Sequence, residues 1–270
     1  MDQLPVNKHW LYEHCVQSPT DLVPLLEQVH GNAPKVLGED FCGTAALAHA
    51  WAASDPGRRA VGVDLDGGAL GYRAPHERVL LHQMDVRDAT GPSDVLFVGN
   101  FSIGYLHTRA DLLCYLRAAR ARLDAAGPGG VFVCDTYGGE SSFRPGAVHR
   151  DHWITGEAAP AGLRGARVRY TWEQRSADPI TARVVDVLHF RVIDVDGVII
   201  DEIDDAFVYD WRLWSVPELG DAMRDAGFGG VEVYDKVPGA IAAEGGAHAL
   251  PIADGSELDE SFIVLVAARA

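Results

Sequence analysis

Short apolar runs alternate with helical patterns in the part of the chain that follows Lys35. Before it, apolar residues at helical spacing within 8–30 indicate helix in pieces, and Thr20 and Asp21 are the expected cap of a helix beginning at Leu22. Short buried strands that alternate with helices are typical of a parallel sheet with helices on both faces. We expect strands at 36–37, 60–63, 79–81, 94–98 and 131–134, and helices over 45–53 and 111–123.

The pattern changes to a period of two beyond residue 166. This alternation predicts antiparallel strands, and Asp196 and Gly197 form a hairpin signal between the second and the third. The preceding stretch, 138–166, is rich in Gly, Pro, Ala and Arg, has little periodicity and is expected to be a long loop. The three apolar stripes are Val168, Tyr170 and Trp172; Val184, Leu188, Phe190 and Val192; and Ile203, Phe207, Tyr209 and Trp211.

Helix boundaries are marked by capping signals in two places. Thr108 followed by Asp111 has the capping-box spacing, and that helix is expected to stop at Gly127. Ser215 followed by Glu218 predicts a second helix start. Strands at 231–234 and 261–266 are expected to complete the sheet.

Composition and charge narrow the class of protein. The chain has 270 residues, 47% hydrophobic and 23% charged, as expected for one large α/β domain, and no apolar run approaches the roughly 18 residues of a membrane helix. The N-terminus carries no signal-peptide pattern and the four cysteines have no C-x-x-C spacing, which favours a cytoplasmic protein without disulfides or a zinc site. The net charge of −16 repels phosphate backbones, so we expect a small-molecule substrate and neither nucleic acid nor membrane as partner.

The stretch 36–66 has the pattern of a nucleoside-cofactor site. A strand, a tight turn, a helix and a second strand that delivers Asp64 place backbone N–H groups and a carboxylate where a cofactor with a ribose would bind. The turn contains only one glycine, Gly43, and acids precede it, so a pyrophosphate would be crowded and repelled. A cofactor with an amino-acid tail and a sulfonium suits the turn better.

At this point the sequence resembles the class I S-adenosylmethionine-dependent methyltransferases. The family's first motif is commonly an acid, two further residues and then Cys-Gly-Thr-Gly or similar, and it corresponds to Glu39-Asp40-Phe41-Cys42-Gly43-Thr44-Ala45. Phe41 and Ala45 stand where the family usually has glycines, and Asp40 stands at a usually apolar position. The later motifs resemble 61–66, 83–86 and 94–106. The resemblance implies a Rossmann-like, mostly parallel sheet of seven strands, with the antiparallel insertion after strand five.

The resemblance also implies roles for individual residues. Asp64 would bind the ribose hydroxyls, Leu65 would contact adenine, and Asp85 would reach the adenine amino group. The bare sequence leaves alternatives open, because Asp64 also suits a strand-end turn, Asp85 a helix cap and Asn100 a turn. The expected cofactor-binding residues are Glu39, Asp40, Phe41, Gly43, Thr44, Asp64, Leu65, Asp85, Val86, Asn100, Phe101 and Ser102.

The acceptor site is less clearly marked. Methyl transfer from a sulfonium needs alignment, exclusion of water and, for some acceptors, a base. We expect catalytic contacts from Tyr12, His107 and His189, since Tyr12 lies in an aromatic segment just ahead of the cofactor unit and histidine titrates near neutrality. Ordinary packing of Tyr12 and ordinary hydrogen bonding of each histidine remain alternatives. His149 and His152 lack a clear third ligand, so no metal is expected.

The sequence thus predicts a small-molecule methyltransferase whose attacked atom, N, O or C, is open. An NAD(P)-dependent oxidoreductase and a non-catalytic S-adenosylmethionine-binding module are the alternatives, and a homodimer is compatible with the chain. The expected organisation is a helical lid over 1–34, a cofactor domain over 35–137 and 213–270, and an inserted β cap with the substrate region over 138–212.

Overall fold

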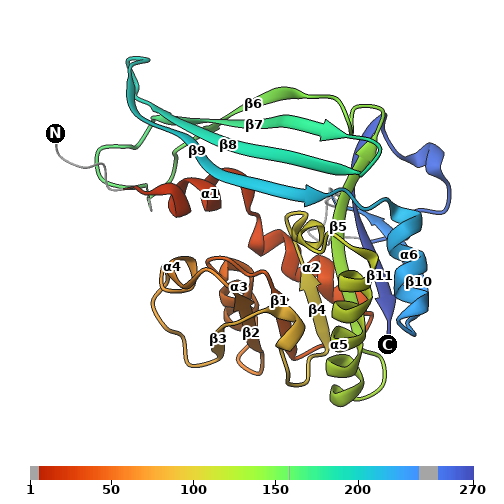
Figure 1. Cartoon of the computed structure of the whole chain (residues 1–270). Coiled ribbons are helices and arrows are strands. Elements are labelled where there is room, and N and C mark those ends of the chain that lie inside the picture. The colour runs from red at the N-terminus through yellow and green to blue at the C-terminus, as the bar shows by residue number, and fades with distance from the viewer. Residues whose placement is uncertain (1–5, 158, 237–248) are drawn as a thin grey trace. The chain divides into compact units, whose positions relative to one another are not determined.

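The computed structural model describes residues 6–157, 159–236 and 249–270. The chain forms two compact units. The smaller unit comprises residues up to Ser18 together with Phe143–Arg212, and the larger comprises Pro19–Ser142 and Leu213–Ala270. Figure 1 labels the helices and strands of both units.

The larger unit contains a seven-stranded sheet of order β10-β11-β5-β4-β1-β2-β3. The strands from β5 to β3 are parallel, whereas β11 runs antiparallel to both β5 and β10. This confirms the predicted Rossmann-like fold class. The strands are β1 (Val36–Asp40), β2 (Arg59–Asp64), β3 (Val79–Gln83), β4 (Val95–Val98), β5 (Val131–Gly139), β10 (Gly229–Asp235) and β11 (Ser261–Arg269).

Helices cover both faces of this sheet. Buried residues of α2 and α3 pack with Leu37 and Phe97 on one face, and those of α5 and α6 pack with Leu96 and Phe132 on the other. The predicted caps Thr108 and Ser215 are confirmed, because their side chains accept the backbone N–H groups of Asp111 and Glu218. The helices are α2 (Pro19–His30), α3 (Ala46–Ser54), α4 (Gly67–Leu70), α5 (Arg109–Ala126) and α6 (Val216–Asp225), with 3₁₀ turns η1 (Val86–Asp88), η2 (Ser102–Tyr105) and η3 (Gly255–Glu257).

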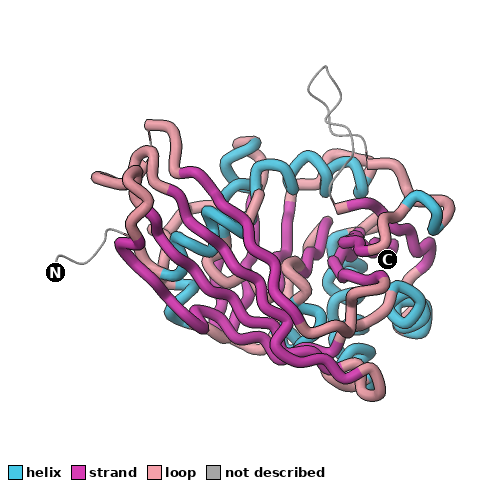
Figure 2. Tube along the Cα trace, turned by 90° about the horizontal axis from the view of Figure 1, so that it is seen from above, coloured by secondary structure: helices cyan, strands magenta, loops and turns pink. Residues whose placement is uncertain are grey.

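The smaller unit is an antiparallel sheet of order β6-β7-β8-β9 with one helix, α1 (Lys8–Val16). Figure 2 shows the four strands side by side. Leu11 of α1 packs with Val168, Leu188 and Phe190 in one apolar cluster, so the helix covers a single face of the sheet. The strands are β6 (Gly146–Trp153), β7 (Arg167–Asp178), β8 (Arg183–Ile193) and β9 (Ile199–Arg212).

Two local predictions were wrong. The stretch 138–166 is not only loop, because it contains β6, an edge strand whose side chains are mostly exposed and therefore show no apolar alternation. Helix α2 begins at Pro19, before the predicted Thr20–Asp21 cap, since proline is favoured in the first turn of a helix. The boundary between the two compact units falls after Ser18, so α2 belongs to the larger unit, and the lid over 1–34 stays a prediction.

Candidate functional site

The predicted cofactor residues gather at one edge of the large sheet. Asp40 pairs with Val63 and Val98, and Val98 pairs with Cys134, so β1, β2 and β4 end within one residue of the same level and β5 passes this level at Cys134. The residues that follow on these strands therefore lie along the carboxyl edge. In open α/β sheets this edge is where ligands bind.

The turn after β1 has a glycine-type backbone although it has a single glycine. Phe41, Gly43 and Ala45 have φ values of 56°, 54° and 57°, in the left-handed region. A residue with a side chain pays about 1–2 kcal/mol for that conformation. The Phe41 ring compensates by stacking on Tyr105 with centroids 5.8 Å apart. The substitutions at Phe41 and Ala45 thus preserve the turn geometry that glycines would adopt freely.

Asp64 ties this turn to the loop after β2. One carboxylate oxygen accepts the backbone N–H of Gly43 at 2.7 Å, and the other accepts that of Asp66 at 2.8 Å. Each oxygen keeps a further lone pair for a ligand hydroxyl. A Cβ built on Gly43 would meet no atom within 4 Å, so the space over the turn is open. An open cradle beside a half-buried carboxylate fits a ribose-bearing cofactor.

Glu39 points toward α3, where Oε2 accepts the backbone N–H of Ala48 at 2.8 Å. Burial raises the pKa of this carboxyl to about 8, and the nearby Asp64 adds to the shift, while the Ala48 hydrogen bond opposes it. Near neutral pH Glu39 is therefore largely protonated. Its charge contributes little to the repulsion of phosphates that the sequence suggested.

Asp40 points to the opposite face of β1. It accepts the Tyr115 hydroxyl at 2.7 Å and Nη1 of Arg122 at 2.8 and 2.9 Å, and none of it is exposed. Burial raises the pKa of Asp40, whereas Arg122 and Tyr115 lower it. The Asp40 side chain is thus engaged in the core, and only its backbone lies at the predicted cofactor position. This differs from the sequence-based expectation of an acid facing the ligand.

Residues after β2 and β3 offer contrasting surfaces. Leu65 is 65% exposed beside Asp64, which leaves an apolar side chain available to a planar group. Asp85 accepts the backbone N–H of Arg87 at 2.9 Å and pairs with its guanidinium, which lowers the pKa of Asp85. The capping alternative for Asp85 is therefore realised in η1, and its adenine contact stays a prediction. Val86 is buried in the core, and its predicted cofactor contact stays a prediction.

The turn after β4 carries the last predicted cofactor residues. Asn100 and Phe101 both have left-handed backbones, and Ser102 begins η2 and is buried, as is Thr44 in the first turn. Asp135 on β5 accepts the backbone N–H groups of both Asn100 and Phe101. Sequence reasoning missed Asp135. The available signal was an acid directly after the apolar run 131–134, the same signal that identified Asp64.

The three predicted catalytic residues are not all brought together. His107 is half-buried between η2 and α5 in the larger unit. Tyr12 and His189 belong to the smaller unit, where Tyr12 packs against Phe207 with ring centroids 5.1 Å apart. Phe207 pairs with Leu188 on the face that α1 covers, so His189 faces the other side of the sheet. One acceptor atom could not contact both Tyr12 and His189.

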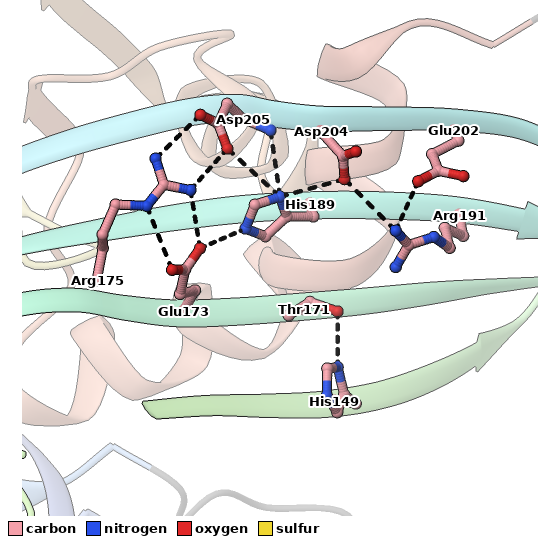
Figure 3. A network of polar contacts seen from close by, with 9 residues as sticks. All are labelled: His149, Thr171, Glu173, Arg175, His189, Arg191, Glu202, Asp204 and Asp205. Carbon is pink, nitrogen blue, oxygen red and sulfur yellow. Dashed lines mark hydrogen bonds and ion pairs between the residues drawn. The ribbon is translucent and has the colours of Figure 1, made fainter. Parts of the chain in front are cut away.

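His189 lies in a polar network on that other face (Figure 3). Its Nε2 lies 2.9 Å from Glu173, and its Nδ1 accepts the backbone N–H of Asp205 at 3.2 Å, which implies that Nε2 carries the proton. Arg175 bridges Glu173 and Asp205 and lowers the pKa of both carboxyls. Both ring nitrogens of His189 thus have protein partners, which argues against the predicted role as a base and for its hydrogen-bonded alternative.

The network is built on an irregular part of β9. The register shifts between the Leu188–Phe207 and Phe190–Ile203 pairs, so three residues of β9 oppose His189 alone. Asp205 in this bulge has φ 49°, which turns its N–H toward the imidazole. The bulge in β9 therefore places the hydrogen-bond donor that His189 accepts.

Two absences concern the described residues only. Within 6–157, 159–236 and 249–270, no group of three or more His, Cys, Asp or Glu side chains is arranged to hold a metal ion. No helix in these ranges is long and apolar enough to cross a membrane.

Comparison with known proteins identifies similar folds. No protein-family model matches the chain, and no curated protein sequence matches it. Among solved structures, CalS10, an amino pentose methyltransferase from Micromonospora echinaspora solved with bound S-adenosylmethionine, has 19% identity and a TM-score of 0.65, covering 100% of both chains. DesVI of Streptomyces venezuelae has 18% identity and a TM-score of 0.65, covering 96% of this chain and 94% of its own. KedS8, a sugar N-methyltransferase from a Streptoalloteichus species, has 19% identity and a TM-score of 0.60, covering 100% of this chain and 96% of its own. At these identities the likeness shows a common fold.

Proposed function

We propose that this chain, which has the fold of the class I methyltransferases, is an S-adenosylmethionine-dependent enzyme that methylates a small molecule. The observation that carries the proposal is the arrangement of Asp64. Its carboxylate joins the turns after β1 and β2 beside the open space over Gly43, at the edge of the sheet where ligands bind. Solved structures with this fold that hold S-adenosylmethionine support the same cofactor here.

The chain's own residues would bind and orient this cofactor. In the proposal Asp64 accepts hydrogen bonds from the ribose hydroxyls, Leu65 covers adenine and Asp85 accepts from its amino group. In the proposal the turns at 41–44 and 100–102 flank the rest of the cofactor. The cofactor supplies an electrophilic methyl group on a sulfonium for in-line displacement, so the task of the protein is alignment and exclusion of water.

We further propose that the acceptor is the amino group of a sugar-like molecule. CalS10 and KedS8 are described as amino pentose and sugar N-methyltransferases, and the chain aligns with both over its whole length. A net charge of −16 favours a cationic amine over an anionic substrate. His107 in the larger unit remains the proposed base.

Calorimetry with S-adenosylhomocysteine and with NAD⁺ and NADP⁺ tests the cofactor. Binding of the nicotinamide cofactors alone would favour the oxidoreductase alternative and overturn the proposal.

Transfer of a labelled methyl group to a panel of aminodeoxysugars, with the matching hydroxysugars as controls, tests the acceptor. Cofactor binding without labelled product from either panel or from a metabolite extract would favour a non-catalytic binding module.

Asp64→Ala is expected to weaken S-adenosylhomocysteine binding by about 1–3 kcal/mol, roughly 5- to 150-fold. The variant removes the proposed ribose acceptor and also leaves the Gly43 N–H without its partner. Isothermal titration measures the change. Asp66→Ala is the matched control, because Asp66 caps α4 through Gly68 and Ala69, and its loss should cost stability but not affinity. Equal affinities for Asp64→Ala and wild type would contradict the ribose assignment.

A further inference from the structure

The turn that follows β4 holds two adjacent residues in an unfavourable backbone conformation. Asn100 and Phe101 have φ values of 54° and 62°, and neither is glycine. Strained residues of this kind persist only where the surrounding structure fixes them, and they cluster at functional sites. The turn therefore needs a specific structural cause.

The Asp135 carboxylate supplies that cause. Oδ2 accepts the N–H of Asn100 at 2.8 Å and Oδ1 accepts the N–H of Phe101 at 2.6 Å, so each oxygen fixes one strained residue. Asp135 is fully buried, and a buried carboxylate that accepts two backbone N–H groups is a strong, oriented clamp.

Lys236 provides the countercharge from the end of β10. Its Nζ lies 2.5 Å from Oδ2 of Asp135 and 5.3 Å from the centre of the Phe101 ring. The Phe101 ring also packs edge-on against Tyr137 at 4.9 Å. Residues of β5 and the residue after β10, which are far apart in the sequence, thus hold both the backbone of the turn and the Phe101 ring.

We propose that Asp135 is a positioning residue for the proposed cofactor site and that Lys236 supports it. Asp135 follows Cys134, which pairs with Val98, so the clamp lies at the same sheet edge as Asp64. By fixing Asn100 and Phe101, the clamp sets where the turn at 100–102 presents its groups to the cofactor. This inference rests on the proposed function, because the turn is one of the predicted cofactor contacts.

The test compares Asp135→Asn and Lys236→Met with wild type. An amide keeps one acceptor but turns an NH₂ group toward the other N–H and toward Lys236, so the turn should open. We expect faster amide hydrogen exchange over 99–102 and about tenfold weaker S-adenosylhomocysteine binding for Asp135→Asn. Lys236→Met should show the same changes to a smaller extent. Lys236→Arg keeps the cation, so its amide exchange and its affinity for S-adenosylhomocysteine should be those of wild type.

Asp94→Asn is the matched control. Asp94 also clamps two backbone N–H groups, those of Lys35 and Val36 at 2.7 and 2.8 Å, but at the opposite end of β1 and β4. The Asp94→Asn variant should be less stable than wild type but should bind S-adenosylhomocysteine with wild-type affinity. Wild-type affinity in Asp135→Asn and Lys236→Met, or unchanged exchange over 99–102 in both, would overturn the positioning role. Failure of wild type to bind S-adenosylhomocysteine would instead overturn the proposed function, and the exchange result would still report whether Asp135 holds the turn.

Discussion

Replacing Arg122 with methionine is expected to lower the free energy of unfolding by about 3–5 kcal/mol. Nη1 of Arg122 donates to both oxygens of Asp40, and the two side chains are 4% and 0% exposed. Without the guanidinium, Asp40 keeps only the Tyr115 hydroxyl as a partner in that ion-pair cluster, and its carboxylate stays buried. Urea unfolding followed by circular dichroism measures the loss.

The double variant Asp40→Asn/Arg122→Met is expected to recover much of this stability, since it removes both charges. Among the described residues, Nε and Nη2 of Arg122 find no hydrogen-bond partner, so the native pair is itself incompletely compensated. Arg224→Met is the surface control, because Arg224 pairs with Asp221 in solvent and should change stability by about 0.5 kcal/mol or less. A double variant as unstable as Arg122→Met alone would show that charge burial is not the cause.

Replacing Glu39 with glutamine is expected to make the protein more stable at pH 8 than wild type, by about 4 kcal/mol. The pKa of Glu39 is raised from 4.5 to about 8 in the folded state. A raised carboxyl pKa stabilises the fold below the unfolded value of 4.5, and that contribution is lost as the pH rises to about 8. Glutamine mimics the protonated form and still offers an oxygen to the Ala48 N–H.

The difference in unfolding free energy between Glu39→Gln and wild type should therefore be small near pH 4.5 and grow steadily up to about pH 8. Denaturant titrations at several pH values measure it, and the comparison cancels groups that titrate alike in both proteins. A constant difference across this range would mean that Glu39 is ionised in the folded protein near neutral pH.

Local signals in the sequence predicted the frame of the fold correctly. The N-cap at Thr108 and the capping box at Ser215 are encoded within four residues, and so is the hairpin at Gly197, whose N–H bonds to the carbonyl of Asp194. Strand β6 was missed because an edge strand with both faces exposed needs no apolar alternation. The periodicity of apolar residues reports which side chains are buried, and turn residues report local backbone geometry. The β6 segment has neither an apolar periodicity nor a turn signal.

The long-range residue pairs at the candidate site could not be predicted from the sequence. Asp40 meets Arg122 across 82 positions, and Asp135 meets Lys236 across 101, so no spacing rule connects them. Their encounter depends on which face each strand residue takes and on which strands become neighbours. The sequence could therefore place Asp40 next to the predicted turn, but not show that its side chain faces the core.

The left-handed Phe41 and Ala45 have a consequence for how a ligand would bind. Glycines at these positions would sample many backbone states in the unfolded chain and retain some of that freedom in the folded turn. Side chains restrict this freedom, so the ordering entropy is lost when the chain folds and not when the ligand arrives. We expect a cofactor to meet a turn already in its bound shape, and its association to be governed by encounter and not by rearrangement.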